Sequence, residues 1–220
     1  MRIARAKDTD RDLQAVLGLI DEARTWLGTM GTDQWASPWP DLKSRDERVR
    51  RGLAVGKTWI VWDDEIAVAT VTIATGPNTK VWSGHDLSDR AVYAHRLITA
   101  RKYAGYGLGA ELIDWAGLSG RRDYGAKWIR IDVWTSNGGL HNYYLQNGFE
   151  RCGTCADRDY PSGALFQKPV SMIRPVGIPL FKGSSAEFDV LDLRAFDIGP
   201  DVATERDASD QGRMLAGQAS

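Results

Sequence analysis

Three glycines at alternate positions, Gly105, Gly107 and Gly109, separate a run of β-forming residues (91–99) from a run with helical spacing that begins at Leu108. Glycines without side chains let backbone N–H groups approach an oxyanion. The start of a helix adds about half a positive charge from its aligned peptide dipoles. This stretch therefore predicts an anion site suited to a pyrophosphate, and the plainer interpretation is a helix opened by flexible glycines with no ligand.

Charge balance and cysteine content argue against several classes of function. The chain has 28 Lys and Arg against 29 Asp and Glu, so no field for tracking nucleic acid is expected. Cys152 and Cys155 form a single C-x-x-C, which cannot complete a zinc site, so no metal site is expected. The N-terminus lacks the apolar segment of a signal peptide, and no apolar run approaches the ~18 residues of a membrane span. We expect a cytoplasmic protein with no membrane partner.

The glycine stretch must be positioned by an alternation of strands and helices. The expected strands are 1–6, 57–62, 66–73, 91–99, 127–134, 149–155 and 163–168, and the expected helices are 8–28, 41–55, 108–120 and 135–145. The third helix is expected to end at Gly117 or Gly120. One strand–helix–strand crossover of parallel type is expected, over 91–134. This order predicts an α/β (α+β) fold with a single mixed, mostly antiparallel sheet of six or seven strands flanked by helices.

The composition changes after Pro169. Prolines, glycines and serines between 175 and 185 indicate an irregular connector, and 187–193 could form one more strand. Residues 199–220 have few large apolar side chains, which is typical of a flexible tail. The predicted organisation is a domain over 1–170, followed by a partly irregular or flexible C-terminal extension over 171–220.

A second motif follows the strand after the glycine-loop helix. Asn137 precedes Tyr144 by seven residues, and Gly148-Phe149 follows after three more. With the glycine loop and the order of elements, this motif makes residues 1–170 resemble the GCN5-related N-acetyltransferase (GNAT) superfamily, of the bacterial small-amine or protein acetyltransferase type. The resemblance implies the acyl-CoA N-acyltransferase (GNAT) fold.

The same glycines also fit the dinucleotide-binding fingerprint G-x-G-x-x-A, over Gly105–Ala110. That fold needs several successive strand–helix crossovers and usually carries its glycine loop after the first strand. In this chain the loop lies mid-chain, after an expected hairpin, and the ribose-binding acid would have to be Asp132, inside a strand. The order of elements favours an acyl-CoA ligand.

The resemblance implies acetyl-CoA as the acyl donor. Backbone groups of Leu97, Ile98 and Thr99 would bond the pantetheine amides and the thioester carbonyl, and Asn137 would bond the pantetheine side of the donor. The pyrophosphate would bind backbone N–H groups of Ala104, Gly105, Tyr106, Gly107, Leu108, Gly109 and Ala110. The family's Arg or Gln at the start of this loop corresponds to Ala104, and Arg101 and Lys102 are the side chains that could replace it.

The resemblance also implies the acid of the reaction. Attack of an amine on a thioester needs a neutral nucleophile, stabilisation of the developing oxyanion and a proton for the departing thiolate. Tyr144 is at the family's position for that proton donor, with the adjacent Tyr143 as a fallback. A purely structural Tyr144, packing its helix on the sheet, is the alternative.

His95 is the candidate general base, because histidine titrates near neutrality. Strand alternation predicts that His95 and Leu97 lie on one face of their strand. A core histidine bonded to the backbone is an alternative, and so is water-mediated deprotonation near Asp86 or Asp89.

The leading expectation is an N-acetyltransferase that transfers an acyl group from acetyl-CoA to a primary amine by direct attack in a ternary complex. The alternative is a non-catalytic acyl-CoA-binding regulatory module, suggested by Ala104. The acceptor could be a small-molecule amine or a protein lysine or N-terminus. Trp26, Trp35 and Trp39 are the candidate substrate-binding residues and suggest an apolar or aromatic acceptor. A homodimer is compatible with the sequence.

Overall fold

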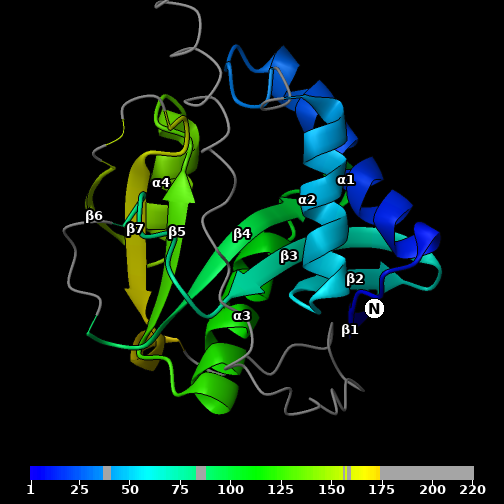
Figure 1. Cartoon of the computed structure of the whole chain (residues 1–220). Helices are drawn as coiled ribbons and strands as arrows, with labels where there is room; N and C mark the ends of the chain where they lie inside the picture. The colour runs from blue at the N-terminus through cyan, green and yellow to red at the C-terminus, as the bar shows by residue number, and fades with distance from the viewer. Residues whose placement is uncertain (37–40, 83–87, 156, 158–159, 174–220) are drawn as a thin grey trace, which may run out of the picture.

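The computed structural model describes residues 1–36, 41–82, 88–155, 157 and 160–173 (Figure 1). The elements in chain order are β1 (Arg2–Arg5), α1 (Asp10–Thr29), α2 (Leu42–Ala54), β2 (Thr58–Asp63), β3 (Ile66–Ala74), β4 (Ala91–Thr99), a 3-10 turn η1 (Arg101–Tyr103), α3 (Leu108–Tyr124), β5 (Trp128–Val133), α4 (Gly138–Gln146), β6 (Glu150–Thr154), β7 (Ala164–Pro169) and a second 3-10 turn η2 (Val170–Met172). The expected order of strands and helices is confirmed.

The described strands form one seven-stranded sheet in the order β1-β2-β3-β4-β5-β7-β6. Five of the six neighbouring pairs are antiparallel, and only β4 and β5 run parallel. A parallel pair needs a crossover connection, which α3 supplies. The expected mixed, mostly antiparallel sheet flanked by helices is therefore confirmed.

Helices cover both faces of the sheet. The core beneath α3 and α4 includes Leu112 and Tyr144 together with Val92 and Ile129 of the sheet. A second core includes Leu17 of α1 and Leu53 of α2, packed with Ile60 and Ile98 of the sheet. These two sides are named the α3 face and the α1/α2 face below.

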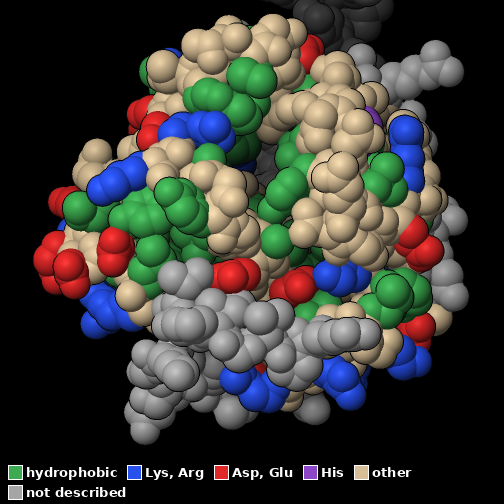
Figure 2. All heavy atoms as spheres, turned by 180° about the vertical axis from the view of Figure 1, so that it is seen from behind, with side chains coloured by type: hydrophobic (Ala, Val, Ile, Leu, Met, Phe, Trp, Pro, Cys, Tyr) green, Lys and Arg blue, Asp and Glu red, His purple; other side chains and the backbone are tan. Residues whose placement is uncertain are grey.

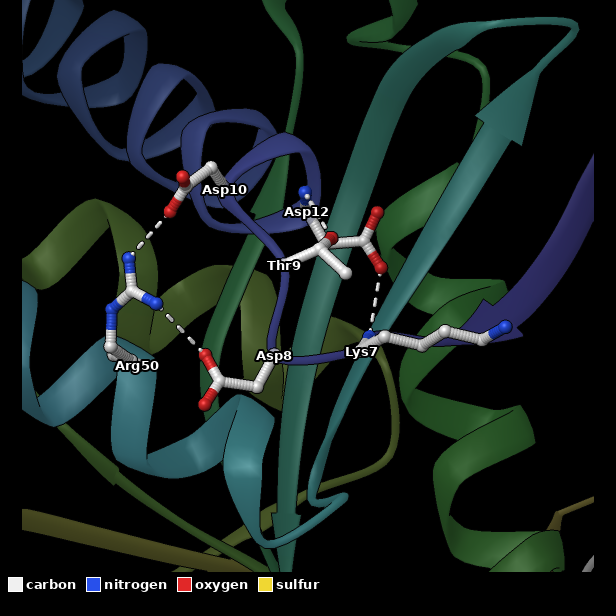
Figure 3. A network of polar contacts seen from close by, with 6 residues as sticks. All are labelled: Lys7, Asp8, Thr9, Asp10, Asp12 and Arg50. Atoms are coloured by element: carbon white, nitrogen blue, oxygen red, sulfur yellow. Dashed lines mark hydrogen bonds and ion pairs between the residues drawn. The ribbon is translucent and has the colours of Figure 1, made fainter.

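Polar contacts anchor the starts of the first two helices, and Figure 3 shows the junction of β1, α1 and α2. Thr9 caps α1 by accepting a hydrogen bond from the Asp12 N–H at 3.3 Å, and Asp12 accepts from the Lys7 N–H at 2.8 Å. Arg50 of α2 donates to Asp8 at 3.1 Å and to Asp10 at 2.8 Å. Arg50 therefore links α2 to the start of α1. The negative charge of Asp10 is favourable there, because it lies at the positive end of the helix dipole.

The third helix is longer than the sequence suggested, because α3 continues through Gly117 and Gly120 to Tyr124. A Cβ at Gly120 would lie 2.5 Å from Val92 Cγ1, and one at Gly117 would lie 2.6 Å from Ile173 Cδ1. These glycines are therefore close-packing positions inside the helix. The helix ends at Gly125, whose φ of 68° is the left-handed conformation typical of a glycine after a helix.

The folded unit extends past the expected boundary at residue 170. Val170 is fully buried, and Ile173 is 5% exposed and belongs to the core beneath α3. The remainder of the predicted extension lies outside the described residues. Within the described ranges, no helix has the length and apolar character needed to cross a bilayer.

Candidate active site

A cleft forms where the two parallel strands separate. Their register pairs Ala91 with Trp128, Val92 with Ile129 and Tyr93 with Arg130, and it stops there. Beyond these pairs, β4 and β5 diverge toward the top of Figure 1. The opening contributes to a cleft of about 2030 Å³, lined from β4, β5 and all four helices and named the central cleft here. Figure 2, turned by 180°, shows a hollow near the upper centre with hydrophobic side chains around it.

A bulge in β4 changes which side chains face which side. Thr70 pairs with Ile98 and Thr72 pairs with His95, so Arg96 and Leu97 together oppose Val71. Arg96 has a φ of 49°, a left-handed backbone that is uncommon for a residue other than glycine. An extra residue in a strand reverses the alternation beyond it, because side chains alternate with a period of two.

The predicted placement of His95 and Leu97 on one face is therefore wrong. Leu97 packs against the core beneath α3. His95 lies two residues beyond Tyr93, and its imidazole is near Asp132 on the α1/α2 face. The cleft thus presents Leu97 on one side of the sheet and an imidazole on the other.

The glycine loop has the predicted shape from Gly105 onward, but the Ala104 N–H, predicted to join the cradle, donates instead to the Arg101 carbonyl oxygen at 3.1 Å. Gly105 and Gly107 have φ values of 84° and 80°, and α3 begins immediately afterwards at Leu108. In the described part of the chain, none of the backbone N–H groups of residues 105–110 donates to a backbone acceptor. Successive free N–H groups at a helix start form an anion-binding site. Tyr106 is 78% exposed and its side chain does not line the cleft, so only its backbone belongs to the cradle.

Ala104 supplies no basic side chain, and the two candidate replacements, Arg101 and Lys102, differ in whether they line the cleft. Arg101 lines the cleft, and its guanidinium carbon lies 3.8 Å from the ring centroid of Trp26. The Lys102 ammonium lies 5.7 Å from the Tyr103 ring centroid, and Lys102 does not line the cleft. Arg101 is therefore the better placed cation.

Tyr144 lies in an aromatic cluster on the α3 face. It is 7% exposed, and its ring centroid lies 5.3 Å from that of Tyr143 and 5.4 Å from that of Phe149. Burial raises the pKa of Tyr144 well above its ordinary value, with smaller contributions from Tyr143 and from the charge of Asp132. Because the residue also lines the cleft, it presents a phenol that stays protonated at neutral pH.

Tyr143 also lines the cleft but packs against the start of α3. A Cβ at Gly109 would lie 2.9 Å from the Tyr143 hydroxyl oxygen, so this contact requires a glycine. Burial, and to a lesser degree Asp114, raises the pKa of Tyr143. Both tyrosine hydroxyls therefore carry a proton that they can donate, and Tyr144 is the more buried of the two.

Asn137 has a structural task that the sequence did not indicate. Its side-chain oxygen accepts from the Leu140 N–H at 2.9 Å and caps α4, and its side-chain nitrogen donates to Gln34 at 2.6 Å. Asp33 accepts from the Trp134 indole at 2.9 Å and from the Ser136 hydroxyl at 2.6 Å. These bonds dock the segment after α1 onto the turn between β5 and α4. They join residues about a hundred positions apart, so neither motif nor periodicity could have revealed them.

The three candidate tryptophans have different outcomes. Trp26 and Trp35 are half-buried and line the cleft, and Trp35 also packs against the core of the α1/α2 face. Trp39 lies outside the described residues. Two of the three are thus positioned where an acceptor could touch them.

Of the two aspartates considered as alternatives to His95, the structure describes only Asp89. Asp86 lies outside the described residues. Asp89 bonds Lys127 at 2.5 Å and the Trp128 indole at 3.3 Å, beside the first residues of β4 and β5. Asp89 precedes His95 by six positions, which is about 20 Å of extended chain. Asp89 is therefore at the wrong end of the strand for the central cleft.

A carboxylate that was considered only for a dinucleotide belongs to this site. The Asp132 Oδ1 lies 3.5 Å from the His95 Nδ1, and the Asp132 Oδ2 accepts from the Tyr160 hydroxyl at 2.9 Å. The parallel register is the signal that could have found it. It pairs Tyr93 with Arg130 and so brings His95 and Asp132, two residues further along each strand, opposite each other on the same face.

The two cysteines lie in and just after β6. Cys152 and Cys155 are both free thiols, and no group of three or more His, Cys, Asp or Glu side chains is spaced to hold a metal ion there. Burial raises the pKa of the Cys152 thiol, which makes a thiolate nucleophile less available.

Comparison with known proteins agrees with this arrangement. Residues 20–149 match the acetyltransferase (GNAT) family. YesJ from Bacillus subtilis (strain 168), described as an uncharacterized N-acetyltransferase, is 29% identical over 164 residues, which cover 73% of this chain and 86% of YesJ.

Solved structures give the same result. A GNAT-family acetyltransferase from Listeria monocytogenes 4b F2365 has a TM-score of 0.60 and 26% identity, covering 76% of this chain and 93% of its own. The PaiA N-acetyltransferase of Thermoplasma acidophilum, solved in complex with coenzyme A, shares the fold with a TM-score of 0.58 at 16% identity, over 76% of this chain and 98% of its own. Because the family match spans more than half of the chain and includes both the glycine loop and the Asn137–Phe149 motif, the chain belongs to the GNAT family of acetyltransferases, and its activity is acyl transfer.

Proposed function

We propose that this protein transfers an acetyl group from acetyl-CoA to a primary amine while both substrates occupy the central cleft. One observation carries the proposal. The cleft passes between β4 and β5, with free backbone N–H groups at the start of α3 and with the His95 imidazole on the α1/α2 face. An anionic donor and an amine acceptor can then approach each other from opposite sides of the sheet.

The donor would bind along the α3 side of the opening. The N–H groups of residues 105–110 suit a pyrophosphate, and the coenzyme A bound to PaiA on the same fold supports this ligand class. Past Tyr93, the edge of β4 toward β5 has no strand partner among the described residues. The backbone of Leu97, Ile98 and Thr99 can therefore bond the pantetheine amides in the manner of an added strand.

Asn137 would act on the donor indirectly. Both polar groups of its side chain are engaged, with the Leu140 N–H and with Gln34. We therefore assign Asn137 the task of fixing the start of α4, which holds Tyr143 and Tyr144 at the cleft.

The chain's own groups account for the protons of the reaction. His95 accepts one proton from the acceptor ammonium, which leaves a neutral amine able to form the N–C bond to the thioester carbonyl carbon. Tyr144 donates its hydroxyl proton to the sulfur as the C–S bond breaks. The second ammonium proton replaces the one that Tyr144 gave, and the first leaves the site on His95. The backbone of the β4 bulge lies at the opening and is the candidate for stabilising the carbonyl oxygen.

A direct transfer is favoured over a covalent acyl-enzyme. The Cys155 thiol lines the cleft, but it is 6% exposed and lies 3.6 Å from the Lys80 carbonyl oxygen, which it bonds. A thiol that is buried and donates to a carbonyl oxygen is poorly placed to attack a thioester. Initial velocities measured while varying both substrates should therefore give intersecting lines, and parallel lines would contradict the ternary complex.

The deciding experiment is an acceptor panel with free-thiol detection and mass analysis of the acceptor. Acetyl-CoA would be offered with alkylamines, aromatic amines, amino acids and lysine peptides, and with no acceptor as the hydrolysis control. We expect acceptor-dependent thiol release and a product heavier by one acetyl group. The apolar cleft walls at Trp26 and Trp35 favour amines with an apolar or aromatic body.

A non-catalytic acyl-CoA-binding module is the second candidate, and Ala104 is the observation that favours it. The loop lacks a basic side chain at that position, which weakens the grip on the phosphates. Acyl-CoA binding by calorimetry without thiol release for any acceptor would support this module. Absence of acyl-CoA binding would contradict both candidates.

A further inference from the structure

Asp132 is an acidic side chain inside a central strand, where acidic residues are disfavoured. Its side chain is 7% exposed, and its neighbours Ile131 and Val133 in β5 belong to the core beneath α3. Burying a carboxylate is costly unless each oxygen meets a donor. Oδ2 of Asp132 meets this condition by accepting from the Tyr160 hydroxyl at 2.9 Å, and Oδ1 lies 3.5 Å from the His95 Nδ1, within ion-pair distance.

The position of this pair is set by the sheet. Tyr93 and Arg130 form the last register pair between β4 and β5, and the Arg130 guanidinium donates to the Tyr93 hydroxyl at 3.1 Å on the same face. Two residues further along, His95 and Asp132 are opposite each other where the strands have begun to separate. The side chains therefore meet at the narrow end of the opening, where the cleft begins.

We propose that Asp132, held by Tyr160, is a positioning residue that makes His95 an effective general base. This rests on the proposed acetyl transfer. A carboxylate facing Nδ1 holds the proton on that nitrogen, and the Nε2 lone pair is then the one available to the acceptor. His95 is 32% exposed at its side chain and lines the cleft, so the free nitrogen has access to the acceptor side.

The proton balance needs no further reactant. The Nε2 of His95 takes a proton from the acceptor ammonium, and the carboxylate of Asp132 stabilises the resulting imidazolium without accepting the proton. Tyr160 keeps its own proton and fixes the carboxylate. The imidazolium then loses its Nε2 proton to water.

A purely structural role is the rival explanation. Asp132 lies two residues from Arg130, which is 4% exposed, so the carboxylate could serve only to balance that buried charge. Such a role would not depend on His95. The two explanations therefore differ in whether the effect of changing Asp132 survives in a protein without the imidazole.

The first test uses nitrogen-15 NMR to determine which imidazole nitrogen carries the proton in the protein without substrates, at a pH where the imidazoles are neutral. The chain has three histidines, and His141 provides an internal reference because its Nε2 lies 2.9 Å from the Trp134 carbonyl oxygen, which can only accept. We expect His95 to carry its proton on Nδ1. In Asp132→Asn the amide oxygen must serve Tyr160, so the amide nitrogen donates to Nδ1 and the His95 proton moves to Nε2, with His141 unchanged.

The second test is a double-mutant cycle on kcat with acetyl-CoA and an active amine. Asp132→Asn should lower kcat by about 10²-fold with an unchanged KM for acetyl-CoA, within the usual worth of general-base catalysis. In a His95→Ala background the same substitution should have no further effect, because a residue that acts through another has nothing left to act on. Asp89→Asn is the matched control, a paired carboxylate at the far end of the strand, and should keep wild-type kcat.

The outcomes separate the two levels of the proposal. A His95 proton on Nε2 in the wild type, or a tautomer that Asp132→Asn leaves unaltered, would overturn the positioning role whatever the kinetics. Equal losses in both backgrounds would also overturn it and would favour charge balance with Arg130. A wild type that binds acetyl-CoA but acetylates no amine would overturn the proposed function instead, and the tautomer result would still decide what Asp132 does to His95.

Discussion

At the scale of single residues, Tyr144 combines a reactive hydroxyl with the surroundings of a core residue. Its ring packs on Tyr143, Phe149 and Phe166. Burial raises its pKa, so the hydroxyl keeps its proton to a higher pH than an ordinary tyrosine does. Tyr144→Phe keeps the ring and removes only the O–H. We expect kcat to fall by about 10²-fold, within the usual range for an acid catalyst, with an unchanged dissociation constant for acetyl-CoA. Thiol release and calorimetry measure the two quantities.

The neighbouring Tyr143→Phe is the natural control for that experiment. Its hydroxyl packs at Gly109 on the start of α3, so removing it should change acetyl-CoA affinity more than kcat. Reversed behaviour of the two variants would transfer the acid role to Tyr143. Wild-type turnover in both would leave the thiolate to be protonated by water.

Residue-level expectations from the sequence succeeded where a motif is local and failed where backbone irregularity intervened. The glycine loop at the start of α3 and the position of Tyr144 at the cleft both lie within short stretches whose spacing is visible in the sequence. The cap at Asn137 was missed, and so was its contact with Gln34, because Gln34 lies about a hundred positions away. The bulge at Arg96 is not, because nothing in residues 91–99 marks an extra residue until β3 is laid beside it. That single residue reversed the relation between His95 and Leu97.

At the scale of elements, α3 approaches the sheet more closely than a helix with ordinary side chains could. Gly120 faces Val92, and a methyl group there would lie 2.5 Å from Val92 Cγ1 and 2.7 Å from Cγ2. We expect Gly120→Ala to destabilise the fold by about 1–3 kcal/mol, the usual cost of overpacking. Urea unfolding followed by circular dichroism measures it.

Gly18→Ala supplies the matched control for that substitution. Gly18 lies within α1, is exposed, and has no atom within 4 Å of a Cβ. The same change there should stabilise the protein by about 0.5–1 kcal/mol through helix propensity. A Gly120→Ala variant as stable as Gly18→Ala would contradict the close packing of α3 on β4.

The elements themselves were largely readable from periodicity, and the exception is informative. Strand alternation and helical spacing predicted the order of the seven strands and four helices that the structure describes, because these patterns come from which faces are buried. The end of α3 was wrong because glycine has two uses, ending a helix and permitting close contact. Only the partner element, here Val92 of β4, decides between them.

At the scale of the whole molecule, we propose that the folded unit reaches at least to Ile173. Val170 and Ile173 are buried in the core beneath α3, and a fully buried aliphatic side chain is worth about 1.5–3 kcal/mol. A chain ending after Pro169 should be less stable than a chain ending after Ile173 by at least about 3 kcal/mol, the sum for two such residues. Urea unfolding of the two chains measures the difference. Equal stability of the two chains would contradict the contribution of Val170 and Ile173 to the fold.

The docking of the segment after α1 onto the turn after β5 gives the protein a built-in spectroscopic probe. The Trp134 indole N–H donates to Asp33 at 2.9 Å, so its NMR resonance reports whether the segment after α1 is docked on the turn after β5. The Ser136 and Trp134 hydrogen bonds lower the pKa of Asp33, so the ionised carboxylate favours the docked state above the ordinary value of ~3.9. The resonance should hold its position from neutral pH to below that value and move only when Asp33 is protonated. A shift of this resonance on adding acetyl-CoA or an amine would then show which substrate alters the contact between Asp33 and Trp134.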